Sequence, residues 1–256
     1  MRIESLVARW ALVGVLLTLA ACGDGGGLDR LAAGERGRVA EVRSGDLFVL
    51  DSGQTVRLTG LDTPWRGEPG AEAAQDDLRR LVGGREVELF HGGARKDDYG
   101  RVLAQVRLVE GRRWVQCALL RDGVARVRTW ADNRALARPM LDCEAEGRRA
   151  RRGLWAGATS PVRLPGEIDG RASGFQIVEG QVARARSTDR GVYLDFKDAR
   201  GGFAAEIDRR AIGDLRKAGL DAPALTGQLV RVRGVIGYDG MMRIDHPEQI
   251  ERLSGR

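Results

Sequence analysis

The alternation of hydrophobic and polar positions divides the chain into two blocks of strands, each interrupted by a helical stretch. In the first block, apolar and β-branched residues form short runs separated by turn residues such as Ser44-Gly45-Asp46, which predicts strands. Residues 71–82 instead place apolar side chains three or four positions apart, which predicts an amphipathic helix. The strands predicted here lie at residues 38–42, 47–50, 55–58, 87–90 and 102–108.

Two further helices are expected at the end of the first block, at residues 115–121 and 135–152. The stretch that follows contains Pro161, Pro165 and several glycines, so it predicts a linker. Both blocks share the order of three strands, a helix and two strands, which is typical of a small Greek-key barrel of the OB type. The second block has strands predicted at residues 175–186, 192–196, 203–207, 228–236 and 242–244, and a helix at 209–218.

The first residues have the pattern of an export signal. Arg2 and Arg9 precede an apolar run over residues 11–21, shorter than the ~20 residues that a membrane-spanning helix needs. The run leads into Leu19-Ala20-Ala21-Cys22-Gly23, which resembles the lipobox of bacterial lipoproteins; an ordinary signal peptide with an incidental cysteine is the alternative. The resemblance implies lipidation of Cys22 and an exported protein anchored by lipid in the bacterial cell envelope, facing the periplasm or the cell surface.

These patterns together predict the domain organisation. The expected parts are a lipoprotein signal peptide (1–21), a tether (22–36), a first domain (37–156), a linker (157–174) and a second β-barrel domain (175–253).

The composition adds a positive charge carried almost entirely by arginine. The chain has 42 Lys+Arg against 36 Asp+Glu, a formal charge of +6, and 43% hydrophobic residues, which excludes fibrous, collagen-like and multi-span membrane proteins. Only Lys96, Lys197 and Lys217 are lysines. The planar guanidinium group suits two-point contacts with phosphate, so the charge suggests a polyanionic partner. Codon bias explains the same arginine content equally well.

Besides Cys22, the predicted exported chain contains two cysteines. Cys117 and Cys143 both lie on predicted helices, and disulfides form in oxidising compartments. A bridge between them would add about 3 kcal/mol of stability. The alternative is a pair of buried free thiols.

Three segments of the first block hold charged residues where a barrel would bring them together. They are Ser44-Gly45-Asp46, residues 56–64 and residues 97–104. Arg57 lies at an otherwise apolar strand, and Arg101 begins another. An arginine near a core must be paired with an anion, because burying an unpaired charge is costly. Reciprocal salt bridges and a shared phosphate and cation both satisfy this requirement.

These segments, with the closing Gly153-Leu154-Trp155, resemble the staphylococcal nuclease family, which consists of Ca²⁺-dependent phosphodiesterases. The resemblance covers residues 37–156 and implies an α+β fold class, namely an OB-type staphylococcal-nuclease-like β-barrel with three helices. A second small OB-like β-barrel is expected behind it. DNA or RNA is the implied partner, and no dinucleotide cofactor is expected.

The resemblance also implies a metal site. The carboxylates of Asp46 and Asp62 and the backbone carbonyl of Thr63 would bind Ca²⁺, a hard cation that takes 6–8 oxygen ligands. Two departures weaken this expectation: Ser44 replaces a nearby acidic residue of many family members, and Leu47 replaces a threonine. Fewer charged ligands imply weaker Ca²⁺ binding.

The remaining implied residues bind and hydrolyse the substrate. Arg57 and Arg101 would clamp the phosphoryl oxygens, and Tyr99 would contact the terminal phosphate. The family's catalytic glutamate follows the Asp-Thr-Pro step, where this chain has Trp65, whose indole accepts no proton. Glu68 is a candidate surrogate base. Trp65 itself either packs over the barrel mouth or stacks against a base.

Three functions follow from these residues. The first is Ca²⁺-dependent hydrolysis of DNA or RNA, weakened by Trp65, and the second is an inactive pseudo-nuclease that binds nucleic acid or another polyanion or acts as a scaffold. The third is a cell-wall or polyanion-binding module in which Tyr193, Phe196 and Phe203 form a platform on the second barrel. Trp130 is expected in the core.

Overall fold

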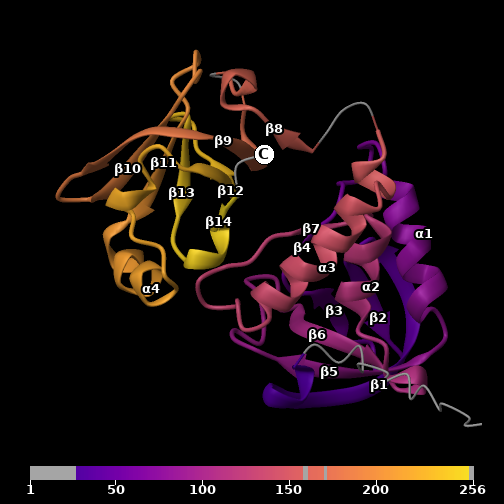
Figure 1. Cartoon of the computed structure of the whole chain (residues 1–256). Coiled ribbons are helices and arrows are strands. Elements are labelled where there is room, and N and C mark those ends of the chain that lie inside the picture. The colour runs from indigo at the N-terminus through magenta and orange to yellow at the C-terminus, as the bar shows by residue number, and fades with distance from the viewer. Residues whose placement is uncertain (1–26, 158–160, 170–171, 254–256) are drawn as a thin grey trace, which may run out of the picture.

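The first domain is a closed barrel of five strands (Figure 1). The computed structural model describes residues 27–157, 161–169 and 172–253. The strands follow the order β1-β2-β3-β6-β5 around the barrel, and the β3–β6 pair is parallel while the other pairs are antiparallel. Their bounds are β1 (Ala32–Ser44), β2 (Leu47–Leu50), β3 (Thr55–Leu58), β5 (Glu86–His91) and β6 (Val102–Leu108).

Three helices cover this barrel: α1 (Ala71–Val82), α2 (Val115–Asp122) and α3 (Ala137–Arg149). A disulfide between Cys117 and Cys143 joins α2 to α3, with 5.3 Å between the two Cα atoms. A two-stranded ladder of β4 (Leu61–Asp62) and β7 (Arg126–Val127) lies beside the barrel and leads into α3. The 3₁₀ helices are η1 (Leu28–Arg30), η2 (Glu110–Arg112), η3 (Gly153–Trp155), η4 (Pro165–Glu167), η5 (Arg209–Ala211), η6 (Pro223–Leu225) and η7 (Pro247–Gln249).

The second domain repeats the topology of the first. Its strands pair in the order β12-β13-β11-β10-β9, the β12–β9 pairing closes the barrel, and β11–β13 is the parallel pair. The small helix α4 (Ile212–Lys217) follows the third strand, as α1 does in the first domain. The bounds are β9 (Gly174–Ser187), β10 (Gly191–Phe196), β11 (Ala204–Asp208), β12 (Leu229–Ile236), β13 (Met241–Ile244) and the flanking β8 (Val162–Arg163) and β14 (Ile250–Arg252). The predicted α+β class with two OB-like barrels is therefore confirmed.

The segments predicted as a tether and a linker contain regular secondary structure. The tether predicted over residues 22–36 contains η1, whose Leu28 is fully buried, and β1 already pairs with β5 from Ala32 onward. The linker predicted over 157–174 contains β8, which pairs with β9 and packs Val162 against a small apolar cluster. Both segments lack alternating side chains, so only their pairing partners show that they are strands. The predicted signal peptide and Cys22 lie outside the described residues, and the described helices include none that is long and apolar enough to span a membrane.

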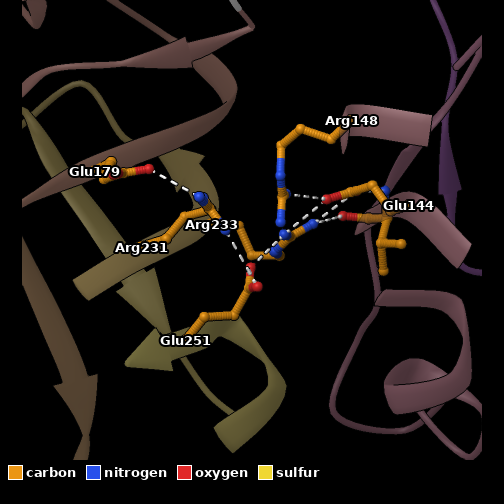
Figure 2. A network of polar contacts seen from close by, with 7 residues as sticks. Glu144, Arg148, Glu179, Arg231, Arg233 and Glu251 are labelled. Carbon is orange, nitrogen blue, oxygen red and sulfur yellow. Dashed lines mark hydrogen bonds and ion pairs between the residues drawn. The ribbon is translucent and has the colours of Figure 1, made fainter. Parts of the chain in front are cut away.

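A buried ion-pair network joins the two barrels (Figure 2). Arg233 of β12 is 2% exposed and donates from both Nη atoms to the fully buried carboxylate of Glu144 on α3, each at 2.9 Å. Arg233 also donates to Glu251 at 2.6 Å, and Arg148 reaches Glu144 at 3.3 Å. Burial by itself would lower the pKa of Arg233. The carboxylates of Glu144 and Glu251 outweigh this effect and raise the pKa above its ordinary value, so the guanidinium stays charged. The network therefore attaches the second barrel firmly to α3.

A second contact between the domains involves His246. Its Nε2 lies 3.2 Å from the hydroxyl of Thr129, and Arg134 pairs with Glu248 beside it at 3.0 Å. Burial lowers the pKa of His246 below its ordinary value of 6.5, and Arg134 adds to this, although Thr129, Asp245 and Glu248 act in the opposite direction. The folded protein therefore holds this imidazole neutral.

We expect the free energy of unfolding to fall as the pH drops below 6.5. In this range His246 binds a proton in the unfolded chain more readily than in the folded protein, where its pKa is lower. Above 6.5 this contribution is fully present. Thermal unfolding midpoints measured on both sides of pH 6.5 test the expectation, with His246→Gln as control. Protonation of carboxylates such as Glu251 lowers the unfolding midpoint of both proteins in acid. The midpoint of the variant should nevertheless fall less steeply with decreasing pH, because the contribution of His246 is absent. Identical slopes would show that His246 does not contribute.

Candidate functional site

A polar pocket of about 290 Å³ opens beside the parallel pair β3–β6. Arg57 lies opposite Leu103 in this pair, and Arg101, which directly precedes β6, lines the same pocket. The pocket therefore unites three residues that the sequence predicted to bind substrate and two that it missed. We call it the arginine pocket; its charged and aromatic lining residues are Arg57, Asp97, Asp98, Tyr99, Arg101, Arg128 and Trp130.

Arg57 is held in the pocket by the turn between β1 and β2. Its Nε lies 3.3 Å from Oδ2 of Asp46, and the Ser44 hydroxyl donates to the other oxygen, Oδ1, at 2.7 Å. The side chain of Arg57 is one third exposed. Among the described residues, no group accepts a hydrogen bond from its Nη atoms, and Asp46 is its ion-pair partner.

Arg101 is held by the turn that precedes β6. Asp97 accepts hydrogen bonds from the backbone N–H groups of Tyr99 and Arg101, both at 3.0 Å, and from Arg101 Nε at 2.6 Å. Partial burial raises the pKa of Asp97, but these hydrogen bonds outweigh it and lower the pKa below the usual value. Tyr99 is largely exposed, and the guanidinium of Arg101 lies 5.0 Å from its ring centre. Among the described residues, no group accepts a hydrogen bond from the Nη atoms of Arg101, as is also the case for Arg57.

Asp62 lies in the ladder of β4 and β7, where two arginines neutralise it. Arg126 is its register partner and donates from Nε and Nη2 to Oδ2, while Arg128 approaches Oδ1 at 3.3 Å. Val127 lies between these arginines, and its N–H donates to Glu144 at 2.6 Å. The Val127 carbonyl accepts from Arg233 of the second barrel at 3.1 Å. The network of Figure 2 thus positions the strand that neutralises Asp62.

The residues expected to bind Ca²⁺ do not fit that ion in this arrangement. Gly45 and Thr63 pack closely, since a Cβ on Gly45 would lie 3.2 Å from that of Thr63, so the segments of Asp46 and Asp62 do adjoin. Both carboxylates, however, face guanidinium groups that would repel a cation. The described residues contain no group of three or more His, Cys, Asp or Glu that could hold a metal.

Glu68, the predicted surrogate base, forms a hydrogen bond with the backbone of its own loop. Glu68 accepts a hydrogen bond from the backbone N–H of Trp65 at 2.7 Å, and the Glu68 N–H donates to the Trp65 carbonyl at 2.8 Å. Glu68 is exposed and does not line the arginine pocket. Trp65 is 69% exposed, so the prediction that it packs over the barrel mouth finds no support. The place of a general base holds a group that cannot accept a proton.

The aromatic platform expected on the second barrel is not formed. Phe196 and Phe203 are buried in the barrel core with ring centres 5.3 Å apart. Tyr193 directs its hydroxyl to Glu206 at 2.8 Å. Trp130, expected in the core, is instead half-exposed and lines the arginine pocket. No local pattern distinguishes its position, because the irregular segment between β7 and α3 carries it.

The first domain thus combines a closed five-stranded barrel with a pocket beside β3–β6 that three arginines line. Residues 55–157 match the family model described as staphylococcal nuclease homologue. The chain therefore contains a domain of the staphylococcal nuclease family, and the resemblance seen in the sequence is confirmed.

Individual relatives agree with the family match. The thermonuclease of Staphylococcus hyicus is 26% identical over 128 residues, which cover 46% of this chain and 75% of the relative. The thermonuclease of Staphylococcus intermedius is 28% identical over 131 residues, covering 48% and 77%. A probable endonuclease of Clavispora lusitaniae is 30% identical over 133 residues, covering 46% and 54%. Each alignment spans less than half of this chain.

Proposed function

We propose that the arginine pocket binds phosphodiester groups of DNA or RNA, so that this nuclease-like chain acts primarily as a nucleic-acid-binding protein. The observation that carries the proposal is the pair of unoccupied guanidinium ends of Arg57 and Arg101 at one pocket. Each arginine is oriented through Nε by its own aspartate, which leaves two Nη groups for two-point contact with phosphate oxygens. Such preoriented donors lose little side-chain entropy when an anion binds.

Two observations favour binding over hydrolysis. Trp65 supplies no proton acceptor, and general-base assistance is worth roughly 10² to 10⁴ in rate. Asp62 is compensated by two arginines, so a metal ion would have to displace them before binding there. The general base that would activate water is thus missing, and the carboxylate that would bind the metal ion is paired with arginines.

Slow Ca²⁺-dependent hydrolysis is the second candidate function. The close packing of Gly45 on Thr63 favours it, because this contact keeps Asp46 and Asp62 on adjoining segments. The relatives that are named thermonucleases also support it. Displacement of Arg126 and Arg128 from Asp62 would free oxygen ligands of the type that Ca²⁺ takes.

We also propose that the protein works outside the cytoplasm, anchored to a membrane through a lipid on Cys22. The bridge between Cys117 and Cys143 supports export, because structural disulfides persist in oxidising compartments. DNA or RNA in the cell envelope would then be its partner.

Replacing Arg57 by alanine tests the binding function. We expect Arg57→Ala to weaken binding of a fluorescent single-stranded oligonucleotide about 10- to 100-fold, because a charge-assisted contact is lost. The slope of log K against the logarithm of the salt concentration should become smaller in magnitude by about 1, because one fewer counterion is released. Fluorescence anisotropy at several salt concentrations gives both quantities.

Arg184→Ala is the matched control, since Arg184 is an exposed arginine that pairs with Asp195 on the second barrel. It should bind like the native protein. Absence of oligonucleotide binding by the native chain, or equal binding by Arg57→Ala, would contradict the proposed function.

A further inference from the structure

A second cavity, of about 170 Å³, lies between the two barrels. Arg128 and Trp130 contribute to it from the first domain, and Phe175 and Val235 from the second. Phe175 and Val235 are direct partners in the β9–β12 pair, so they form one continuous wall. We call this cavity the inter-barrel cleft. Arg128 and Trp130 also line the arginine pocket, so the two cavities adjoin across these side chains.

Of the two aromatic residues that line the inter-barrel cleft, Trp130 is half-exposed and Phe175 is buried. The guanidinium of Arg128 lies 4.6 Å from the ring centre of Trp130 and 5.5 Å from that of Phe175. Trp130 is 50% exposed and Val235 37%, which is unusual for large apolar side chains beside a cavity. Arg128 Nε is buried and has no hydrogen-bond partner. The cleft thus combines apolar walls with the guanidinium of Arg128, which pairs with Asp62 through Nη1 but has no hydrogen-bond partner at Nε.

The position of the inter-barrel cleft is fixed by the network of Figure 2. Arg233 lines the cleft and forms the buried pair with Glu144 across the domain boundary. Gln249, another lining residue, donates to the Arg233 carbonyl at 3.1 Å. A cleft held open by buried ion pairs needs little reorganisation when a ligand enters, which favours binding.

We propose that the inter-barrel cleft binds the nucleobase adjacent to the phosphodiester held in the arginine pocket, so that both barrels together bind single-stranded nucleic acid. The inference rests on the proposed function and adds the substrate class to it. Aromatic walls bind bases by stacking, whichever base is present. A base inside the cleft is unpaired, because a base in a duplex must be extruded before it enters a protein pocket. Arg128 lines both cavities and pairs with Asp62, so the phosphate that links the two positions would lie beside this ion pair.

Oligonucleotides with and without bases test this inference. The probes are a short oligothymidylate, an abasic oligomer of the same length and charge, and a matched duplex. We expect the native chain to bind the oligothymidylate about tenfold more tightly than the abasic oligomer or the duplex, since stacking provides the difference. Quenching of Trp130 fluorescence by the oligothymidylate alone, with Trp130→Phe as spectral reference, provides a second readout.

Variants assign the effect to the cleft. Val235→Asp places a carboxylate on an exposed strand position in the cleft and should bind the oligothymidylate and the abasic oligomer equally. Leu164→Asp, the control, changes an exposed leucine that lines a different cavity and should keep the tenfold preference. Arg57→Ala should weaken both probes to the same extent and retain their ratio.

The outcomes separate the cleft from the phosphate pocket. If the native chain binds the oligothymidylate and the abasic oligomer equally, and Arg57→Ala weakens both, the inference about the cleft is wrong and the proposed function stands. A preference that persists in Val235→Asp would also overturn it. Absence of any native binding would overturn both proposals.

Discussion

Replacing Arg233 by methionine is expected to lower the free energy of unfolding by about 3–5 kcal/mol. The side chain is almost fully buried, and its removal leaves the buried carboxylate of Glu144 without its principal cation. Arg148 contacts Glu144 at 3.3 Å but through one oxygen only, so it compensates part of the charge. Urea denaturation followed by circular dichroism, with a separate probe for each domain, measures the loss.

The double variant Glu144→Gln with Arg233→Met is the informative control. It removes both charges, while the glutamine still accepts from the Val127 N–H, so most of the lost stability should return. Arg184→Met, which changes an exposed ion pair, should cost under about 1 kcal/mol. Losses of similar size for Arg184→Met and Arg233→Met would show that the network does not join the barrels as inferred.

Replacing Trp65 by glutamate is expected to raise chelator-sensitive cleavage of single-stranded DNA or RNA by about 10² to 10⁴ over the native chain. The change supplies a proton acceptor where the staphylococcal nuclease family has its catalytic glutamate. It also adds a third carboxylate near Asp46 and Asp62, and cation affinity rises with the number of charged ligands. Cleavage of a labelled oligonucleotide with Ca²⁺ and then with chelator gives the rate, and calorimetric titration with Ca²⁺ gives the affinity.

Trp65→Gln is the matched control, because it has the same length as glutamate but no charge. It should leave both cleavage and Ca²⁺ affinity at the native level. Chelator-sensitive cleavage by the native chain that Glu68→Gln abolishes would instead make hydrolysis the function, with Glu68 as the base. Equal behaviour of Trp65→Glu and Trp65→Gln would show that the arginines on Asp62 block the metal position.

The network and the site are connected through one strand. Glu144 and Arg233 hold the backbone of Val127 from its two sides, and the neighbouring Arg126 and Arg128 reach Asp62. The second barrel therefore contacts the backbone that places the arginines of the first. Residues of both barrels therefore line one cleft.

Local sequence patterns predicted the parts of this protein that depend on neighbouring residues. Alternation and turn residues located the strands of both barrels and their shared order, and the helix at residues 71–82 agrees with α1 at Ala71–Val82. Arg57 and Arg101 were predicted to share a site, and both line one pocket. These features follow from side-chain periodicity and from motifs within short segments.

Long-range pairing decided the rest. Asp62 acquires Arg126 and Arg128 from more than 60 positions away, and Glu144 acquires Arg233 across a separation of 89. Strands β4, β7 and β8 are too short for an alternating pattern, and only their partners reveal them. The sequence by itself determined two barrels and a pair of arginines that share one pocket. The tertiary structure decided that guanidinium groups neutralise the expected metal ligand and that a cleft forms between the barrels, because both depend on contacts between segments that no local pattern relates.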